Sequence, residues 1–91
     1  MVVQEIREII TDAIKKRYAE VAVPAFSVEL PENPEHGDYA SNIALVLAKT
    51  LKKNPMKIAR ELESGIRNQE LWTLEIAPPG FINFKLTPLV L

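Results

Sequence analysis

The stretch Glu75-Ile76-Ala77-Pro78-Pro79-Gly80-Phe81-Ile82-Asn83-Phe84-Lys85-Leu86 decides the fold of this chain. It predicts two strands joined by a Pro-Pro-Gly turn, because proline and glycine interrupt regular structure and favour turns. Successive side chains of a strand point to opposite faces of a sheet. One face of the second strand therefore holds Ile82, Phe84 and Leu86, and the other holds Phe81, Asn83 and Lys85. The first face predicts a hydrophobic core.

The second face carries an aromatic ring, an amide and a cation in one row, which is an unusual set for a solvent-exposed surface. A flat ring stacks on a nucleobase, an amide hydrogen-bonds to a base edge, and an ammonium group meets a phosphate. Phe81, Asn83 and Lys85 therefore indicate an RNA contact. An edge strand with one half-covered Phe fits the same pattern, because single exposed apolar residues are common.

Three segments before this hairpin have helical periodicity. Residues 2–18 place Val3, Ile6, Ile10, Ala13, Ile14 and Arg17 on one stripe. The second helix is expected to run from Asp38 to about Lys52, with Ala40, Ile43, Ala44, Leu47, Ala48 and Leu51 on one face. The third is expected to end near Asn68 and to bury Ile58, Ala59, Leu62 and Ile66.

Local signals predict where the second and third helices begin. Asp38 is expected to cap the second helix through its carboxylate, with Gly37 permitting the tight turn before it. Asn54 and Pro55 suit the cap and first turn of the third helix. Residues 25–30 alternate as a short strand, and so do Trp72, Leu74 and Ile76.

Together these elements predict an α+β domain, with three helices packed on one face of a short antiparallel sheet. Residues 1–91 are expected to form a single domain. Thr87 and Pro88 indicate the start of a truncated C-terminal helix, so we expect a domain excised from a longer chain.

Composition excludes several classes of function. The chain has no cysteine, one histidine and a net charge of -1. Disulfides and thiolate metal sites are excluded, a cytoplasmic setting is expected, and any RNA binding must use local patches. No segment resembles a signal peptide or a membrane span, and we expect neither membrane nor DNA partners.

Two basic clusters have both a structural and a functional interpretation. Lys15, Lys16 and Arg17 suit the negative end of a helix dipole, or they bind a phosphate. Around the junction of the second and third helices, basic residues outnumber Glu61 and Glu63, and they form either a solvated face or a patch for the RNA backbone. These residues are Lys49, Lys52, Lys53, Lys57 and Arg60.

Catalytic and metal-binding interpretations find little support. His36 and Ser41 lie close in sequence, but nothing predicts that they form a nucleophile and base pair. Glu32, Glu35 and Asp38 fit a solvated acidic loop better than a magnesium site. No phosphate-binding loop or dinucleotide motif is present. We therefore expect no catalytic residues, no metal site and no cofactor in this chain.

Three segments together resemble the N-terminal region of arginyl-tRNA synthetases. Residues 77–84 are similar to the family's GPGFINF-type segment, residues 36–42 to its (F/H)GDYA-N segment, and residues 53–59 to its NP-x-x-IA helix junction. They occur in the same order and cover essentially the whole chain. The chain departs from the family at Pro78, where glycine is usual. Because proline has no N–H, Pro78 cannot donate a hydrogen bond to tRNA at this position.

The resemblance implies the additional N-terminal domain of an arginine–tRNA ligase, a class I aminoacyl-tRNA synthetase. The parent enzyme would use ATP and magnesium to join arginine to tRNA(Arg), through nucleotide motifs outside this chain. This domain would touch the D-loop at the outer corner of the tRNA, with Phe81 stacking on a base and Asn83 bonding to its edge. Lys85, Lys49, Lys52 and Lys53 complete the expected tRNA-binding set. The alternative is a structural domain whose Phe81 face docks on the remainder of its own chain or on a partner protein.

Overall fold

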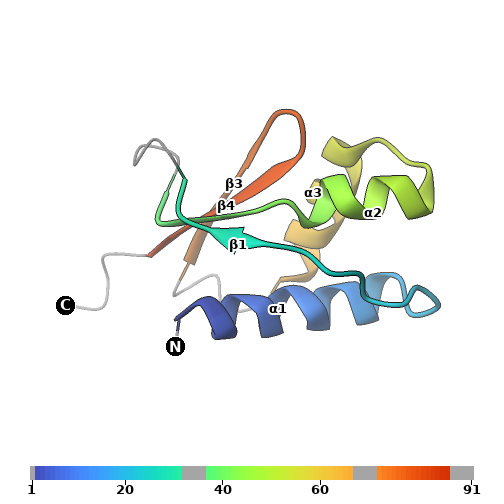
Figure 1. Cartoon of the computed structure of the whole chain (residues 1–91), viewed down its shortest axis with the longest axis horizontal. Coiled ribbons are helices and arrows are strands. Elements are labelled where there is room, and N and C mark those ends of the chain that lie inside the picture. Colours follow the sequence, from blue (N-terminus) through green and yellow to red (C-terminus); the bar gives the residue numbers. More distant parts are fainter. Residues whose placement is uncertain (1, 32–36, 67–71, 87–91) are drawn as a thin grey trace.

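The computed structural model describes residues 2–31, 37–66 and 72–86. The elements in chain order are α1 (Val2–Arg17), β1 (Val28–Glu29), β2 (Tyr39–Ser41), α2 (Ile43–Leu51), α3 (Pro55–Gly65), β3 (Trp72–Ala77) and β4 (Phe81–Leu86). The strands form one antiparallel sheet in the order β1-β2-β4-β3 (Figure 1). The helices pack against one another and against one face of this sheet. The predicted α+β class is therefore confirmed.

The hairpin of β3 and β4 has the predicted faces. Trp72 pairs with Leu86 at one end and Ala77 with Phe81 at the other, and the Gly80 N–H donates to the Ala77 carbonyl across the turn (3.0 Å). Ile82 and Phe84 are fully buried on the helix-covered face. The ring of Phe84 meets Trp72 edge to face, with 6.1 Å between centroids. The alternation of side chains along β4 therefore correctly predicted which residues face the core.

Each helix buries a narrow apolar stripe, as its periodicity predicts. α1 buries Ile6, Ile10, Ala13 and Ile14, α2 buries Ile43, Ala44 and Leu47, and α3 buries Ile58, Ala59 and Leu62. Arg17 does not belong to the buried stripe, because 53% of its side chain is exposed. The predicted cap of α3 is confirmed: the Met56 N–H donates to Asn54 Oδ1 (2.8 Å), and Pro55 is the first helical residue.

The start of the second helix was predicted wrongly. Residues 39–41 form strand β2 instead of a first helical turn, and Asp38 therefore caps no helix. α2 begins at Ile43, whose N–H is met by Ser41 Oγ (3.2 Å). The physical reason is non-local: Tyr39 and Ser41 pair with Phe84 and Ile82 of β4. A three-residue strand is too short for its alternation to be visible in the sequence.

Strand β1 is shorter than predicted. Only Val28 and Glu29 pair with β2, opposite Ser41 and Ala40. Val28 is buried, whereas Leu30 is 75% exposed and lies outside the core. Pairing stops before Leu30 and Tyr39, so the alternation of residues 25–30 does not extend into a longer strand.

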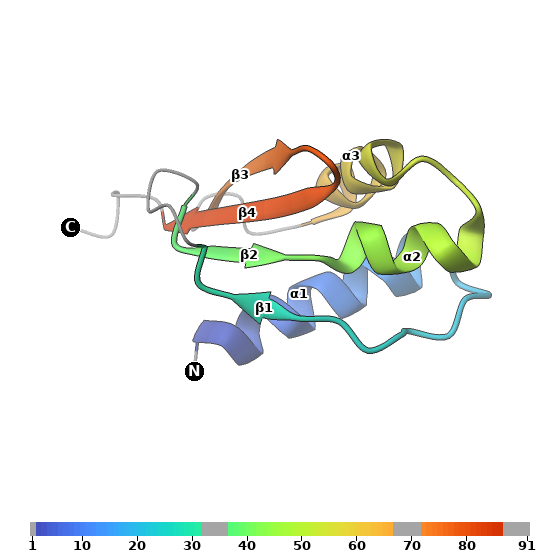
Figure 2. The same cartoon turned by 45° about the horizontal axis from the view of Figure 1, so that its top comes forward.

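Two glycines fix how the loops approach the sheet and helices. Gly37 has a φ of 109°, and a Cβ there would lie 2.9 Å from the Phe84 carbonyl oxygen. At Gly80, a Cβ would lie 2.6 Å from Cβ of Pro55. The tip of the hairpin therefore packs directly on the start of α3, which joins the sheet to the α2–α3 junction (Figure 2).

Several sequence-based predictions lie outside the described residues. His36, Glu32 and Glu35 are among them, as is the predicted helix start at Thr87. The predicted end of α3 near Asn68 was too late, because α3 ends at Gly65 and Ile66 is extended. Among the helices that the structure describes, none has both the length and the apolar character needed to cross a bilayer.

Candidate nucleic-acid interface

The sheet has a second face that points away from the core. Cross-strand pairing aligns Glu29, Ala40, Asn83 and Glu75 in one row across all four strands. Side chains in such a row share a face because paired residues point to the same side. Phe81 and Lys85 lie on this face at the positions flanking Asn83 along β4. The sequence-predicted row of ring, amide and cation is thus brought together as expected.

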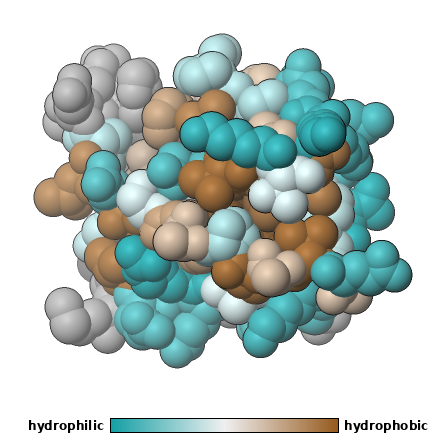
Figure 3. Space-filling view, turned by 45° about the vertical axis from the view of Figure 1, so that its right-hand side comes forward, coloured by the Kyte–Doolittle hydropathy of each residue, from teal (hydrophilic) through white to brown (hydrophobic). Residues whose placement is uncertain are grey.

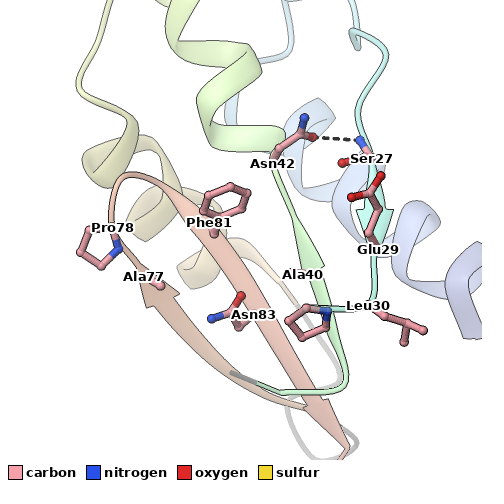
Figure 4. Close-up of a pocket in the computed structure, with 10 residues that line it drawn as sticks. Ser27, Glu29, Leu30, Ala40, Asn42, Ala77, Pro78, Phe81 and Asn83 are labelled. Atoms are coloured by element: carbon pink, nitrogen blue, oxygen red, sulfur yellow. Dashed lines mark hydrogen bonds between the residues drawn. The ribbon is translucent and has the colours of Figure 1, made fainter. Parts of the chain in front are cut away.

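A cavity of about 420 Å³ opens on this outer face. Ala40 lies on its floor, and Figure 4 shows Glu29 and Asn83 on opposite sides of this small residue. On the β1 side, the Ser27 N–H donates to Asn42 Oδ1 (2.9 Å) and holds the wall in place. The lining residues are Ser27, Glu29, Leu30, Pro31, Ala40, Asn42, Ala77, Pro78, Phe81 and Asn83.

Asn83 is the most unusual side chain of the cavity. Its residue is only 4% exposed, although it faces away from the hydrophobic core. Within residues 2–31, 37–66 and 72–86, its amide makes no side-chain hydrogen bond. Buried polar groups are nearly always hydrogen-bonded, either to protein or to ordered water. The Asn83 amide therefore marks a position where a polar group of a ligand could form a hydrogen bond with the protein.

Phe81 and Lys85 differ in their relation to the cavity. Phe81 is half-buried and forms part of the wall beside Pro78. Lys85 is exposed on the same face but does not line the cavity. The site therefore offers an aromatic wall and an amide inside, with an ammonium group near its edge. None of the lining residues is Lys or Arg, so the cavity itself suits a flat uncharged group better than a phosphate.

A family model described as "Arginyl tRNA synthetase N terminal domain" matches residues 4–86. The chain belongs to this family. Among curated relatives, arginine–tRNA ligase of Anaeromyxobacter sp. (strain Fw109-5) is 42% identical over 97% of this chain. Arginine–tRNA ligase of Thermotoga maritima is 42% identical over 96% of it. The chain spans 16% of the length of each of these two relatives.

Solved structures of arginyl-tRNA synthetases contain the same fold. The enzyme from Plasmodium falciparum matches with a TM-score of 0.84 and 25% identity, covering 94% of this chain and 16% of that one. The enzyme from Thermus thermophilus matches with a TM-score of 0.70 and 31% identity, covering 96% of this chain and 14% of that one. The chain therefore corresponds to the N-terminal domain of arginyl-tRNA synthetases in both sequence and fold.

In this synthetase domain, the predicted basic patch lies at the α2–α3 junction. Lys49 and Lys52 are exposed, and Lys52 ends α2 in the left-handed conformation with its N–H on the Ala48 carbonyl. Lys53 is less available, because its Nζ lies 3.1 and 3.3 Å from the two carboxylate oxygens of Glu61. Figure 3 views the molecule from the side of α2 and α3 and shows apolar side chains bordered by hydrophilic ones.

Glu61 also ties α3 to the end of α1. Its carboxylate accepts a hydrogen bond from the Tyr18 hydroxyl and pairs with Arg17 at 3.2 Å. The Tyr18 hydrogen bond and then Lys53 lower the pKa of Glu61 to about 2. Burial, followed by the bond to Glu61, raises the pKa of Tyr18 to about 12. This cluster gives Arg17 and Lys53 a structural role, which the sequence did not predict.

Sequence reasoning missed the β1 side of the cavity. Residues 25–30 were expected to alternate as a short strand, and neither Ser27 nor Glu29 was expected in a site. Ala40 leaves space between longer side chains on this sheet face, but its place there depends on the pairing of β2 with β1 and β4. Across the described part of the chain, no three His, Asp or Glu side chains gather as metal ligands.

Proposed function

We infer that this domain is the tRNA-binding module of an arginine–tRNA ligase and contacts the D-loop at the outer corner of tRNA(Arg). The observation that carries this inference is the buried amide of Asn83, which makes no side-chain hydrogen bond within the described residues and lines a cavity on the sheet face opposite the core. Family membership supports it, because the relatives are arginine–tRNA ligases. In such an enzyme, ATP and magnesium would bind in the catalytic part of the chain. This domain would add affinity for the tRNA.

The cavity would receive one unstacked base. The Phe81 ring would stack on it, and Asn83 would form hydrogen bonds to its edge. Sequence-specific RNA recognition commonly uses such splayed bases, stacked on aromatic side chains and bonded at their edges. One stacked base contributes about 1–3 kcal/mol, so the contact would tune tRNA affinity without supplying all of it.

The nucleic-acid backbone would lie over the lysines outside the cavity. Lys85 follows Asn83 on the same face, and the packing of Gly80 on Pro55 brings the hairpin tip to the α2–α3 junction. Lys49 and Lys52 would therefore meet neighbouring phosphates. Lys53 would contribute positive charge while remaining held by Glu61.

A binding experiment with a synthetase carrying this domain tests the proposal. Phe81→Ala should weaken tRNA(Arg) binding by about 1–3 kcal/mol and leave the fold intact. Lys85→Gln should reduce the steepness of the salt dependence of binding, by about one unit of log K against log salt. If neither variant changes tRNA affinity, the sheet face does not contact tRNA.

The second candidate is docking on protein, and the exposure of Leu30 favours it. Leu30 is 75% exposed and lines the cavity with Pro31, Pro78 and Phe81. Such an apolar edge would suit the remainder of the synthetase chain or another protein. Binding that is insensitive to salt but lost in Leu30→Ser would support this candidate over tRNA contact.

A further inference from the structure

Strand β3 forms one open edge of the sheet. The strand order β1-β2-β4-β3 places it beyond β4 (Figure 2), and within the described residues no strand pairs with its other side. It runs for six residues, Trp72–Ala77, in unbroken register with β4. Natural proteins usually protect such an edge by shortening it or by adding proline, lysine or a bulge. β1 is protected because it is only two residues long, whereas β3 has none of these features.

The backbone groups that face this open edge follow from the hydrogen bonds of the neighbouring strands. The Asp38 N–H donates to the Phe84 carbonyl at 2.8 Å, so the backbone groups of Phe84 point toward β2 and away from β3. Phe84 is paired with Leu74. Two paired residues either exchange hydrogen bonds or both turn away from each other. The N–H and C=O of Leu74 therefore point to the open edge, and by alternation so do those of Trp72 and Ile76.

The side chains at the same positions leave an apolar surface that ends at this edge. Trp72 is buried, but Leu74 and Ile76 are only half-buried, although both pack against the core. A groove of about 380 Å³ lies between the first half of the strand and the end of α3, where Glu63 and Ser64 line it. The edge therefore suits another extended strand whose apolar side chains face the helices.

The sequence of β3 is complementary to itself in one antiparallel register. When Leu74 lies opposite Leu74 of a second copy, Trp72 lies opposite Ile76, and apolar side chains meet along the helix-covered face. On the outer face Thr73 lies opposite Glu75 twice, so that a hydroxyl can donate to each carboxylate. A shift by two residues in one direction would place the two Glu75 carboxylates opposite each other, which is destabilising. The same shift in the other direction would pair only the first half of each strand.

We propose that β3 is an interaction surface for a second copy of this chain, and that it joins two four-stranded sheets into one across a two-fold axis at Leu74. The edge-facing backbone groups of each copy would form hydrogen bonds with those of the other, as in the addition of a strand to a sheet. Ile76 of each copy would enter the groove beside Trp72 of the other. The net charge of -1 leaves little repulsion between copies. Because the contact is small, the association should be weak.

Hydrogen exchange of the backbone amides tests which edge is used. In the 91-residue chain at about 0.05 mM, the amides of Leu74 and Ile76 should exchange quickly, and at about 1 mM they should be protected. The amides of Thr73 and Glu75 point toward β4 and should be protected in both samples. Sedimentation should show the mass rising with concentration from 10.2 kDa toward twice that value.

Two substitutions at the exposed residue Thr73 test the register. Thr73→Glu places a carboxylate opposite Glu75 of the second copy and should raise the dissociation constant of the dimer roughly two-fold to thirty-fold, the range for two such pairs. Thr73→Lys places an ammonium group there and should lower the constant by a similar factor. Within one copy, Thr73 lies opposite Lys85, so the stability of the fold should change in the reverse direction. Loss of folding therefore cannot imitate either result.

The double variant Thr73→Glu, Glu75→Lys restores an opposite-charge pair in the same register and should dimerise at least as well as the wild type. A chain that stays monomeric at about 1 mM overturns the proposal. A dimer that Thr73→Glu and Thr73→Lys weaken equally forms through another surface and also overturns it. Protection of Leu74 and Ile76 that does not depend on concentration would mean that another part of the same chain covers this edge, which excludes pairing between copies.

Discussion

Replacing Asn83 by leucine should stabilise this domain. The amide is 4% exposed and has no side-chain hydrogen bond within the described residues. A buried polar group without a partner costs about 1–3 kcal/mol. Leucine branches at the same carbon, removes that cost and finds room in the adjacent cavity. The free energy of unfolding should therefore rise by about 1–3 kcal/mol, after allowance for imperfect packing.

Asn42→Leu is the matched comparison, because its amide oxygen accepts the Ser27 N–H at 2.9 Å. This variant leaves a backbone donor unsatisfied and should lose about 1–3 kcal/mol. Urea denaturation measures both free energies. A domain of this size shifts its Tm by about 4–8 °C per kcal/mol, so the two variants should move in opposite directions by at least about 4 °C. The reasoning is refuted if Asn83→Leu lowers Tm as Asn42→Leu does.

Three further predictions concern the scaffold. Phe84→Ala should cost about 3–5 kcal/mol in urea denaturation, because the ring is fully buried against Trp72; a loss below about 1 kcal/mol would contradict its place in the core. Gly80→Ala should cost about 1–3 kcal/mol, since the new Cβ would meet Pro55 at 2.6 Å, and an unchanged Tm would show that the tip moves freely. Glu61 has its pKa lowered from 4.5 to about 2, so its stabilising effect is present above pH 4.5 and is lost as the pH falls toward 2. The Tm of Glu61→Gln should therefore fall less over that pH range than the Tm of the wild-type chain. An equal fall in both Tm values would contradict a stabilising effect of the Glu61 carboxylate.

The parts of the fold carried by local periodicity could be predicted from the sequence. The stripe of α1, the Asn54 cap of α3 and the face of Ile82 and Phe84 all follow from spacing within one element. Strand β2 could not be predicted, because residues 39–41 are extended only through pairing with β4. The apolar spacing that begins at Ala40 continues into α2 and hid the boundary between strand and helix.

The candidate site could be predicted only in part. Phe81 and Asn83 were found because both lie on one strand, where parity alone fixes their face. Glu29 is brought to the same row by two successive pairings, through Ala40, and no local pattern contains that information. The burial of Asn83 was also unexpected, since strand alternation gives the direction of a side chain but not what surrounds it. The pairing of Lys53 with Glu61 again depends on tertiary contact.

The affinity of Asn83→Leu for tRNA(Arg) tests the central claim most directly. In a synthetase carrying this domain, we predict that the variant binds tRNA(Arg) about five-fold to one hundred-fold more weakly, the range for loss of one good base contact. Its domain should be at least as stable as the wild type. Gln4→Leu introduces the same side chain at an exposed position of α1, outside the cavity and the sheet, and should leave the affinity unchanged. An Asn83→Leu variant that folds normally and binds tRNA(Arg) with wild-type affinity would contradict the account.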